Sequence, residues 1–136
     1  MLKIHHIGCL VDEIETSKDA YRKLFGIDPI PETFFITSQK VFVSFIDIGK
    51  DMYLELIQPT EDNTTLSRLR KNNTSYYHIG YTVNNLKKSI DNFLALNSLL
   101  VNTFRSEAFE GRECAFLYTP EMHLIELIEN GLKNKV

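Results

Sequence analysis

The chain has 136 residues, of which 43% are hydrophobic and 24% are charged, so it is long enough to bury the core of one soluble domain. No apolar run approaches the roughly 20 residues that cross a bilayer, and the net charge of −3 offers no basic face for nucleic acid. We therefore expect one domain over residues 1–136 with no membrane and no nucleic acid partner. The opening MLKIHHIG lacks the features of a secretory signal, which favours the cytoplasm.

The first half of the chain is predicted to form a strand, a helix and three further strands. The first strand is IHHIGCLV at residues 4–11. Thr16 can cap the helix that follows, and Gly26 can end it. The predicted apolar face of this helix consists of Ala20, Tyr21, Leu24 and Phe25. The three later strands are predicted at residues 33–37, 41–48 and 52–58.

The second half is predicted to have the same order of elements. Residues 60–74 are polar and rich in turn formers, which is typical of a linker, and a short helix is predicted over residues 65–71. The strand YYHIGYTV at residues 76–83 precedes a helix whose apolar stripe consists of Leu86, Ile90, Phe93 and Leu94. The last three strands are predicted at residues 99–104, 113–118 and 123–129. The modules therefore span about 1–59 and 75–130, and the fold class is α+β with tandem βαβββ modules.

Two histidines and two glutamates occupy matching positions of this repeat. His6 aligns with His78, and in each half ten positions separate a phenylalanine from the glutamate of an ELI strand, which gives Glu55 and Glu126. Because alternate residues of a strand share a face, both glutamates point away from the leucines that pack beneath the helices. If the two copies pack about a pseudo-twofold axis, the four side chains converge. Such a set suits one divalent transition metal, such as Ni²⁺, Co²⁺, Zn²⁺ or Mn²⁺.

Other interpretations of the polar residues remain open at this point. The histidines could be hydrogen-bonded core residues and the glutamates solvated strand ends. His5 competes with His6 as a ligand, although the alignment with His78 selects His6, and His123 is expected at the surface or a strand edge. Cys9 and Cys114 lack the spacing of a zinc cluster and are expected to be reduced, buried thiols.

The segments IHHIGCLV, YLELIQP, YHIGYTV and AFLYTPEMHLIELIE resemble the vicinal oxygen chelate superfamily. This superfamily includes glyoxalase I, methylmalonyl-CoA epimerase, extradiol dioxygenases and the fosfomycin and bleomycin resistance proteins, and the resemblance covers nearly the whole chain. It implies an incomplete barrel around a metal, a homodimer, and a metal site that one chain or two chains supply. The ligands that it implies are His6, Glu55, His78 and Glu126.

The complete His/Glu/His/Glu set is similar to that of the isomerase and epimerase branch. In that branch a metal acts as a Lewis acid on a carbonyl and stabilises the enediolate that forms when the adjacent C–H loses its proton. The resemblance implies a carboxylate as the base, with Glu126 as the first choice and Glu55 as the second. We expect an isomerase, epimerase or lyase that binds a small molecule.

The first expectation for the substrate is an acyl-CoA thioester, as in methylmalonyl-CoA epimerase. Five basic residues could meet CoA phosphates or form a solvated charged face: Arg68, Arg70, Lys71, Arg105 and Arg112. The loop TPEMH is shorter than in those epimerases, and Val43 stands where some of them carry a second carboxylate base.

The alternatives are a hemithioacetal substrate, as in glyoxalase I, and a protein that binds a carboxylate or thioester without turnover. The ligand set, the short final loop and the compact length favour glyoxalase I. However, Gly8, Cys9 and Leu10 stand where glutathione enzymes often have an arginine after the first ligand. Retention of both glutamates argues for chemistry over simple binding.

Overall fold

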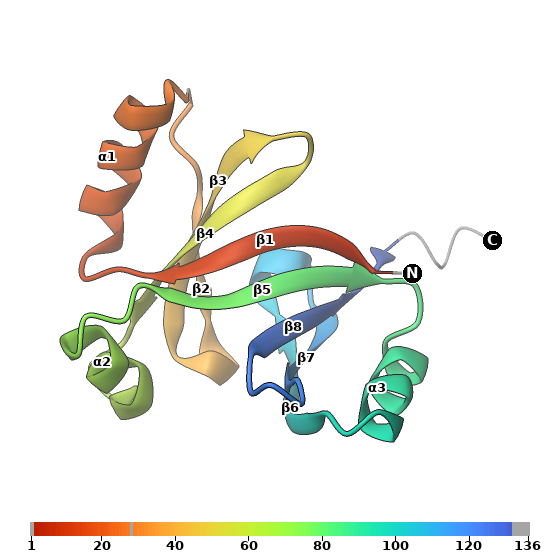
Figure 1. Cartoon of the computed structure of the whole chain (residues 1–136). Coiled ribbons are helices and arrows are strands. Elements are labelled where there is room, and N and C mark those ends of the chain that lie inside the picture. Colours follow the sequence, from red (N-terminus) through yellow and green to blue (C-terminus); the bar gives the residue numbers. More distant parts are fainter. Residues whose placement is uncertain (1, 28, 132–136) are drawn as a thin grey trace. The chain divides into compact units, whose positions relative to one another are not determined.

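A computed structural model describes residues 2–27 and 29–131. Residues 1, 28 and 132–136 of the predicted domain lie outside the described residues. The chain divides into two compact units, one from His6 to Tyr77 and the other comprising the described residues up to His5 and from His78 onward (Figure 1). Among the described helices, none has the length and apolar character needed to span a membrane.

The first unit is built on a four-stranded sheet. Its elements are β1 (Lys3–Leu10), α1 (Ile14–Phe25), β2 (Thr33–Ile36), β3 (Val41–Gly49), β4 (Met52–Pro59) and α2 (Thr64–Lys71). The part of β1 that belongs to this unit begins at His6. The strand β1 pairs parallel with β4, β4 pairs antiparallel with β3, and β3 pairs antiparallel with β2. The helix α2 lies in the predicted linker and agrees with the predicted helix to within one residue.

The second unit has the same pairing scheme. Its elements are β5 (Tyr76–Val83), α3 (Leu86–Ala95), β6 (Leu99–Ser106), β7 (Arg112–Tyr118) and β8 (Leu124–Glu129). The part of β5 that belongs to this unit begins at His78. The strand β5 pairs parallel with β8, β8 pairs antiparallel with β7, and β7 pairs antiparallel with β6. Each unit also has a short 3₁₀ turn between its second and third strands, at Thr37–Gln39 and Glu107–Phe109. The predicted α+β fold with tandem βαβββ modules is confirmed.

The helices α1 and α3 each cover one face of the sheet of their own unit. The helix α1 packs on β3 and β4 around a core that consists of Val11, Ile14, Ile46 and Leu56. The helix α3 packs on β6, β7 and β8 around a core that includes Leu86, Leu117, Ile125 and Leu127, with Ile90 and Phe93 against it. Because alternate strand residues point to opposite faces, the glutamates of β4 and β8 lie on the faces away from the helices.

The start and the buried face of α1 differ from the prediction. The cap is Glu13 and not Thr16, because the Glu13 carboxylate accepts hydrogen bonds from the backbone N–H groups of Glu15 and Thr16. Gly26 ends the helix at φ 66°, as predicted. Ala20, Leu24 and Phe25 are exposed, Leu24 at 73%, so the predicted apolar face is wrong except for Tyr21, which packs against the core. In α3 the predicted stripe is wrong at Leu94, which is also exposed.

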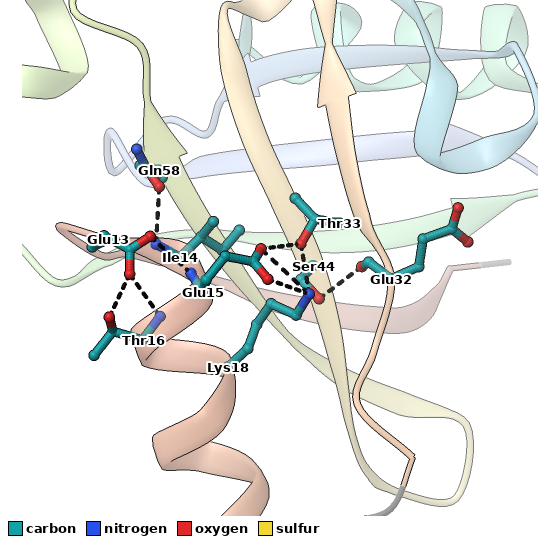
Figure 2. Close-up of polar contacts among 9 residues, drawn as sticks. All are labelled: Glu13, Ile14, Glu15, Thr16, Lys18, Glu32, Thr33, Ser44 and Gln58. Atoms are coloured by element: carbon teal, nitrogen blue, oxygen red, sulfur yellow. Dashed lines mark hydrogen bonds and ion pairs between the residues drawn. The ribbon is translucent and has the colours of Figure 1, made fainter.

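Lys18 occupies the buried face of α1. Its side chain is 6% exposed, and Nζ donates hydrogen bonds to Glu15 Oε1 at 3.2 Å and to Thr33 Oγ1 at 2.7 Å (Figure 2). Thr33 Oγ1 in turn donates to Glu15 Oε2 at 2.7 Å. A buried ammonium needs such partners, and these contacts attach α1 to β2.

Candidate metal centre

The first histidine and glutamate form a buried pair in the unit of residues 6–77. His6 lies on β1 and Glu55 on the neighbouring strand β4, and His6 Nε2 is 3.3 Å from Glu55 Oε1. In the register of the two strands, Glu55 lies opposite Gly8, which has no side chain, while His6 lies opposite Tyr53. His6 is fully buried and Glu55 is 6% exposed.

The second histidine and glutamate form an equivalent pair in the other unit. His78 on β5 places Nε2 at 3.2 Å from Oε1 of Glu126 on β8. Glu126 lies opposite Gly80, as Glu55 lies opposite Gly8. Both side chains are buried. The duplication therefore preserves the contact and the glycine beside it.

A phenylalanine accompanies each pair, which our sequence reasoning did not assign to the site. Phe45 lies opposite Glu55 in the register of β3 and β4, and its ring meets that of His6 edge-on with the centroids 5.6 Å apart. Phe116 lies opposite Glu126, and its centroid is 5.1 Å from that of His78. The signal in the sequence was the ten-residue spacing between each phenylalanine and its glutamate. These rings restrict the imidazoles and keep the surroundings apolar.

The geometry of each pair suits metal binding. Burying a carboxylate beside an imidazole costs free energy unless further partners compensate. Two ligand atoms bound to one metal at about 2.1 Å, at angles between about 90° and 110°, lie about 3.0–3.4 Å apart. The N···O separations of 3.3 and 3.2 Å fall in this interval. Since catalytic metal sites use about three protein ligands, a metal at one pair would require ligands from elsewhere.

In each unit, the side chain three residues after the glutamate binds the start of a helix. Gln58 Oε1, on β4, accepts a hydrogen bond from the Ile14 backbone N–H at 2.9 Å (Figure 2). Glu129 Oε2, on β8, accepts one from the Leu86 backbone N–H at 2.8 Å. Each therefore satisfies an N–H at the start of a helix. The strand that carries each glutamate is thus held at a defined position against α1 or α3.

The remaining histidines and Cys9 lie outside these pairs. His5 packs its ring edge-on against Phe109, with centroids 5.2 Å apart. His123 is exposed, as predicted. Burial, and secondly the negative charge of Glu55, raise the pKa of the Cys9 thiol to about 11. Cys9 is therefore a neutral thiol at physiological pH, and a neutral thiol is a poor metal ligand.

The basic residues that could meet phosphates have different environments. Arg70 Nε donates a hydrogen bond to Asp12 Oδ1 at 2.8 Å, and Arg105 pairs with Glu113 at 3.0 Å. Arg68 and Lys71 are exposed, and Arg112 is half-buried. Val43 is 2% exposed and lies opposite Ile57, so no carboxylate occupies that position on the face of Glu55.

A known protein family matches almost the whole chain. The profile of the Glyoxalase/Bleomycin resistance protein/Dioxygenase superfamily matches residues 5–129. The mitochondrial methylmalonyl-CoA epimerase of Dictyostelium discoideum is 24% identical over 131 residues, which are 93% of this chain and 78% of that protein.

Solved structures of similar fold include two bacterial epimerases. Methylmalonyl-CoA epimerase from Mycobacterium tuberculosis superposes with a TM-score of 0.80 at 19% identity, over 97% of this chain and 90% of that chain. A Streptomyces coelicolor methylmalonyl-CoA epimerase in complex with 2-nitronate-propionyl-CoA gives a TM-score of 0.77 at 22% identity, over 95% of this chain and 97% of that chain. At these identities the likeness establishes the fold.

Proposed function

The chain belongs to the Glyoxalase/Bleomycin resistance protein/Dioxygenase superfamily, and within it we propose that the protein is a metal-dependent epimerase of an acyl-CoA thioester. The observation that carries this proposal is the pair of buried His–Glu contacts, one in each unit. Methylmalonyl-CoA is the first candidate substrate, because the similar proteins include methylmalonyl-CoA epimerases in sequence and in structure.

The proposed cofactor is one divalent transition metal that both His–Glu pairs hold together. Its ligands would be His6, Glu55, His78 and Glu126, two imidazoles and two carboxylates. This donor set suits Ni²⁺, Co²⁺, Zn²⁺ or Mn²⁺. The support comes from the chemistry of each buried pair and from the repeat that produced two of them, since neither pair alone supplies enough ligands.

The proposed reaction begins with loss of the proton next to the thioester carbonyl. When bound, the metal would act as a Lewis acid on the carbonyl oxygen and make that proton more acidic. The Glu126 carboxylate accepts the proton, since it is buried and its position is fixed by His78 at 3.2 Å. The Phe116 ring keeps water away from the same imidazole.

Epimerisation also requires that a proton return to the opposite face of the carbon. Val43 supplies no acid at the position where some epimerases carry a second carboxylate. We therefore assign the return of the proton to Glu55, the other buried carboxylate of the proposed set. This assignment makes the two glutamates unequal in role although they are equal in position within the repeat.

Val43 is also the observation that favours a second candidate, a glyoxalase I-type isomerase. Isomerisation of a hemithioacetal moves a proton between neighbouring carbons, which one carboxylate can do from a single side. An apolar Val43 is compatible with that reaction without any reassignment of Glu55.

The test is exchange of the α-proton in heavy water. Metal-loaded protein is incubated with methylmalonyl-CoA or with the hemithioacetal of glutathione and methylglyoxal, and deuterium uptake and product are followed by NMR. We expect exchange and epimerisation of methylmalonyl-CoA. Product from the hemithioacetal alone would establish the second candidate. Binding of either compound without exchange would reject the catalytic proposal in favour of a binding protein.

We propose in addition that the protein acts as a homodimer, with support from the family alone. Mixing the His6→Ala/Glu55→Ala variant with the His78→Ala/Glu126→Ala variant tests whether two chains share a metal. Recovery of activity on mixing indicates a shared site, and no recovery, with dimers present by light scattering, indicates a site within one chain.

A further inference from the structure

Arg112 differs from the other half-buried arginines in its electrostatic surroundings. Arg22 pairs with Asp19 at 3.2 Å and Arg70 with Asp12 at 2.8 Å. Arg112 is also half-buried, yet within residues 2–27 and 29–131 no carboxylate lies at ion-pair distance from it. A partly desolvated guanidinium without a counter-charge costs free energy, which an anionic ligand would recover.

The Arg112 side chain is nevertheless held in place. Its Nε donates a hydrogen bond to the Phe109 carbonyl oxygen at 3.1 Å, and its Cζ lies 6.0 Å above the centroid of the Phe109 ring. The guanidinium also lies against Gly131, where an added Cβ would stand 3.4 Å from Cζ. These contacts engage Nε and pack against the guanidinium group. The two terminal NH₂ groups have the geometry that binds phosphate or carboxylate oxygens in a bidentate manner.

Arg112 lies on the same face of the sheet as the candidate catalytic pair. Alternation along β7 places Arg112, Cys114 and Phe116 on one face. Phe116 contacts His78 and lies opposite Glu126. Phe116 lies four residues after Arg112, which corresponds to about 13 Å along the strand. This distance is too long for a group attached to the reacting carbon, but it suits a group at the far end of an extended arm.

We propose that Arg112 binds a phosphate group of the CoA moiety and thereby selects CoA thioesters over shorter thioesters. The inference rests on the proposed function, since it assumes that an acyl-CoA occupies the face that carries His78 and Glu126. The ligand chemistry is an oxyanion, for which the substrate offers two sources, the CoA phosphates and the acyl carboxylate. The separation along β7 favours the phosphates.

Arg105 provides the matched control. It lies on β6 of the same hairpin, but its side chain is 69% exposed and already pairs with Glu113 at 3.0 Å. Removal of its charge should leave substrate binding unchanged, because solvent and an existing partner already compensate it.

Calorimetric titration separates the two sources of the oxyanion without requiring turnover. The probes are propionyl-CoA, which has phosphates but no acyl carboxylate, and methylmalonyl-pantetheine, which has the carboxylate but no phosphates. For Arg112→Gln we expect propionyl-CoA to bind about 10- to 100-fold more weakly, with methylmalonyl-pantetheine unchanged. Arg112→Lys should recover part of the loss, and Arg105→Gln should match the wild type. In turnover, Arg112→Gln should raise KM with kcat within about twofold of wild type.

Three outcomes would overturn the inference. Equal affinity of wild type and Arg112→Gln for propionyl-CoA rejects the role of Arg112 while leaving the epimerase proposal intact. A loss for methylmalonyl-pantetheine as large as that for propionyl-CoA shows that Arg112 supports the folded site and not the phosphates, and the melting temperature of Arg112→Gln should then be lowered as well. Failure of the wild type to bind propionyl-CoA rejects the acyl-CoA substrate class itself, and the inference with it.

Discussion

The two units of the chain share their buried pairs and differ in the residues around them. Each unit keeps a histidine, a glutamate opposite a glycine, and a phenylalanine against the imidazole. Beside these, Val43 and Cys114 occupy equivalent places, since each lies opposite the isoleucine two positions after the glutamate. Val41 begins β3 where Arg112 begins β7. The repeat thus keeps the residues that suit a metal in both units, while the flanking positions differ between the units.

The largest effect is expected from removing the histidine of one unit at a time, which tests whether both units are needed for catalysis. If both pairs serve one metal, His6→Ala and His78→Ala should each reduce α-proton exchange more than about 100-fold, because each removes a ligand that the remaining three do not replace. Exchange is measured by NMR in heavy water. His123→Ala, at an exposed position, is the control and should retain full activity. A histidine variant with normal activity would show that its unit takes no part in catalysis.

Glu55 and Glu126 occupy equivalent positions of the repeat, but we assign them different roles, and their variants test this difference. Glu126→Gln should reduce the rate of α-proton abstraction by about 10²–10⁴-fold, the usual contribution of a general base. Glu55→Gln should abstract the proton faster than Glu126→Gln, but it should fail to invert the centre. Deuterium incorporation and chirality are followed in the same sample. A larger loss of deuterium uptake in Glu55→Gln than in Glu126→Gln would mean that Glu55 abstracts the proton and Glu126 returns it.

The helices give a comparison that concerns stability and not catalysis. The helix α1 buries Lys18 where α3, at the matching position of the repeat, packs Ile90 against its core. The Glu15 side chain is 63% exposed, so water can solvate its carboxylate once the Lys18 ammonium is gone. Because Lys18→Ile also fills the buried site with an apolar side chain, it should leave the free energy of unfolding within about 1 kcal/mol of wild type. Lys18→Ala, which leaves a void, should cost about 1–2 kcal/mol. Urea denaturation measures both, and a costly Lys18→Ile would show that the network itself is needed.

The smallest expected effect is the pH dependence that Glu15 contributes. The hydrogen bond from Thr33, and then that from Lys18, lower the pKa of Glu15 below its ordinary value. The unfolded chain therefore binds this proton at higher pH than the folded chain does, so the contribution is present above the ordinary pKa and is lost as pH falls through the folded value. Urea unfolding between pH 6 and pH 3 should show a shallower decline for Glu15→Gln than for wild type. If the free energy of unfolding falls equally in wild type and in Glu15→Gln, water screens the contacts of Glu15 and they contribute nothing to the pH dependence.

The internal repeat made much of the fold predictable. Two similar segments reinforce each other, so the strand and helix order and the apolar residues beneath the helices followed from periodicity. The helix in the linker was predicted from its own segment, outside the repeat. The residues His6, Glu55, His78 and Glu126 were singled out in the same way, and the structure adds the contact within each unit.

What could not be predicted depends on contacts between residues distant in sequence. Glu13 caps α1 through a long carboxylate side chain, although shorter side chains are the usual caps. Lys18 is buried because Thr33 and Glu15 lie beside its ammonium, which no helical period reveals. The half-buried state of Arg112, with a fixed guanidinium and no carboxylate beside it in the described part of the chain, likewise became visible only in the folded structure.

The most direct test of the central claim, that both His–Glu pairs hold one metal, is metal content by plasma mass spectrometry. The samples are wild type, His6→Ala/Glu55→Ala and His78→Ala/Glu126→Ala, each reconstituted and desalted. We predict close to one transition metal per chain in the wild type and almost none in either variant. Two metals per chain, retention of metal when one pair is removed, or no metal in the wild type would contradict the claim.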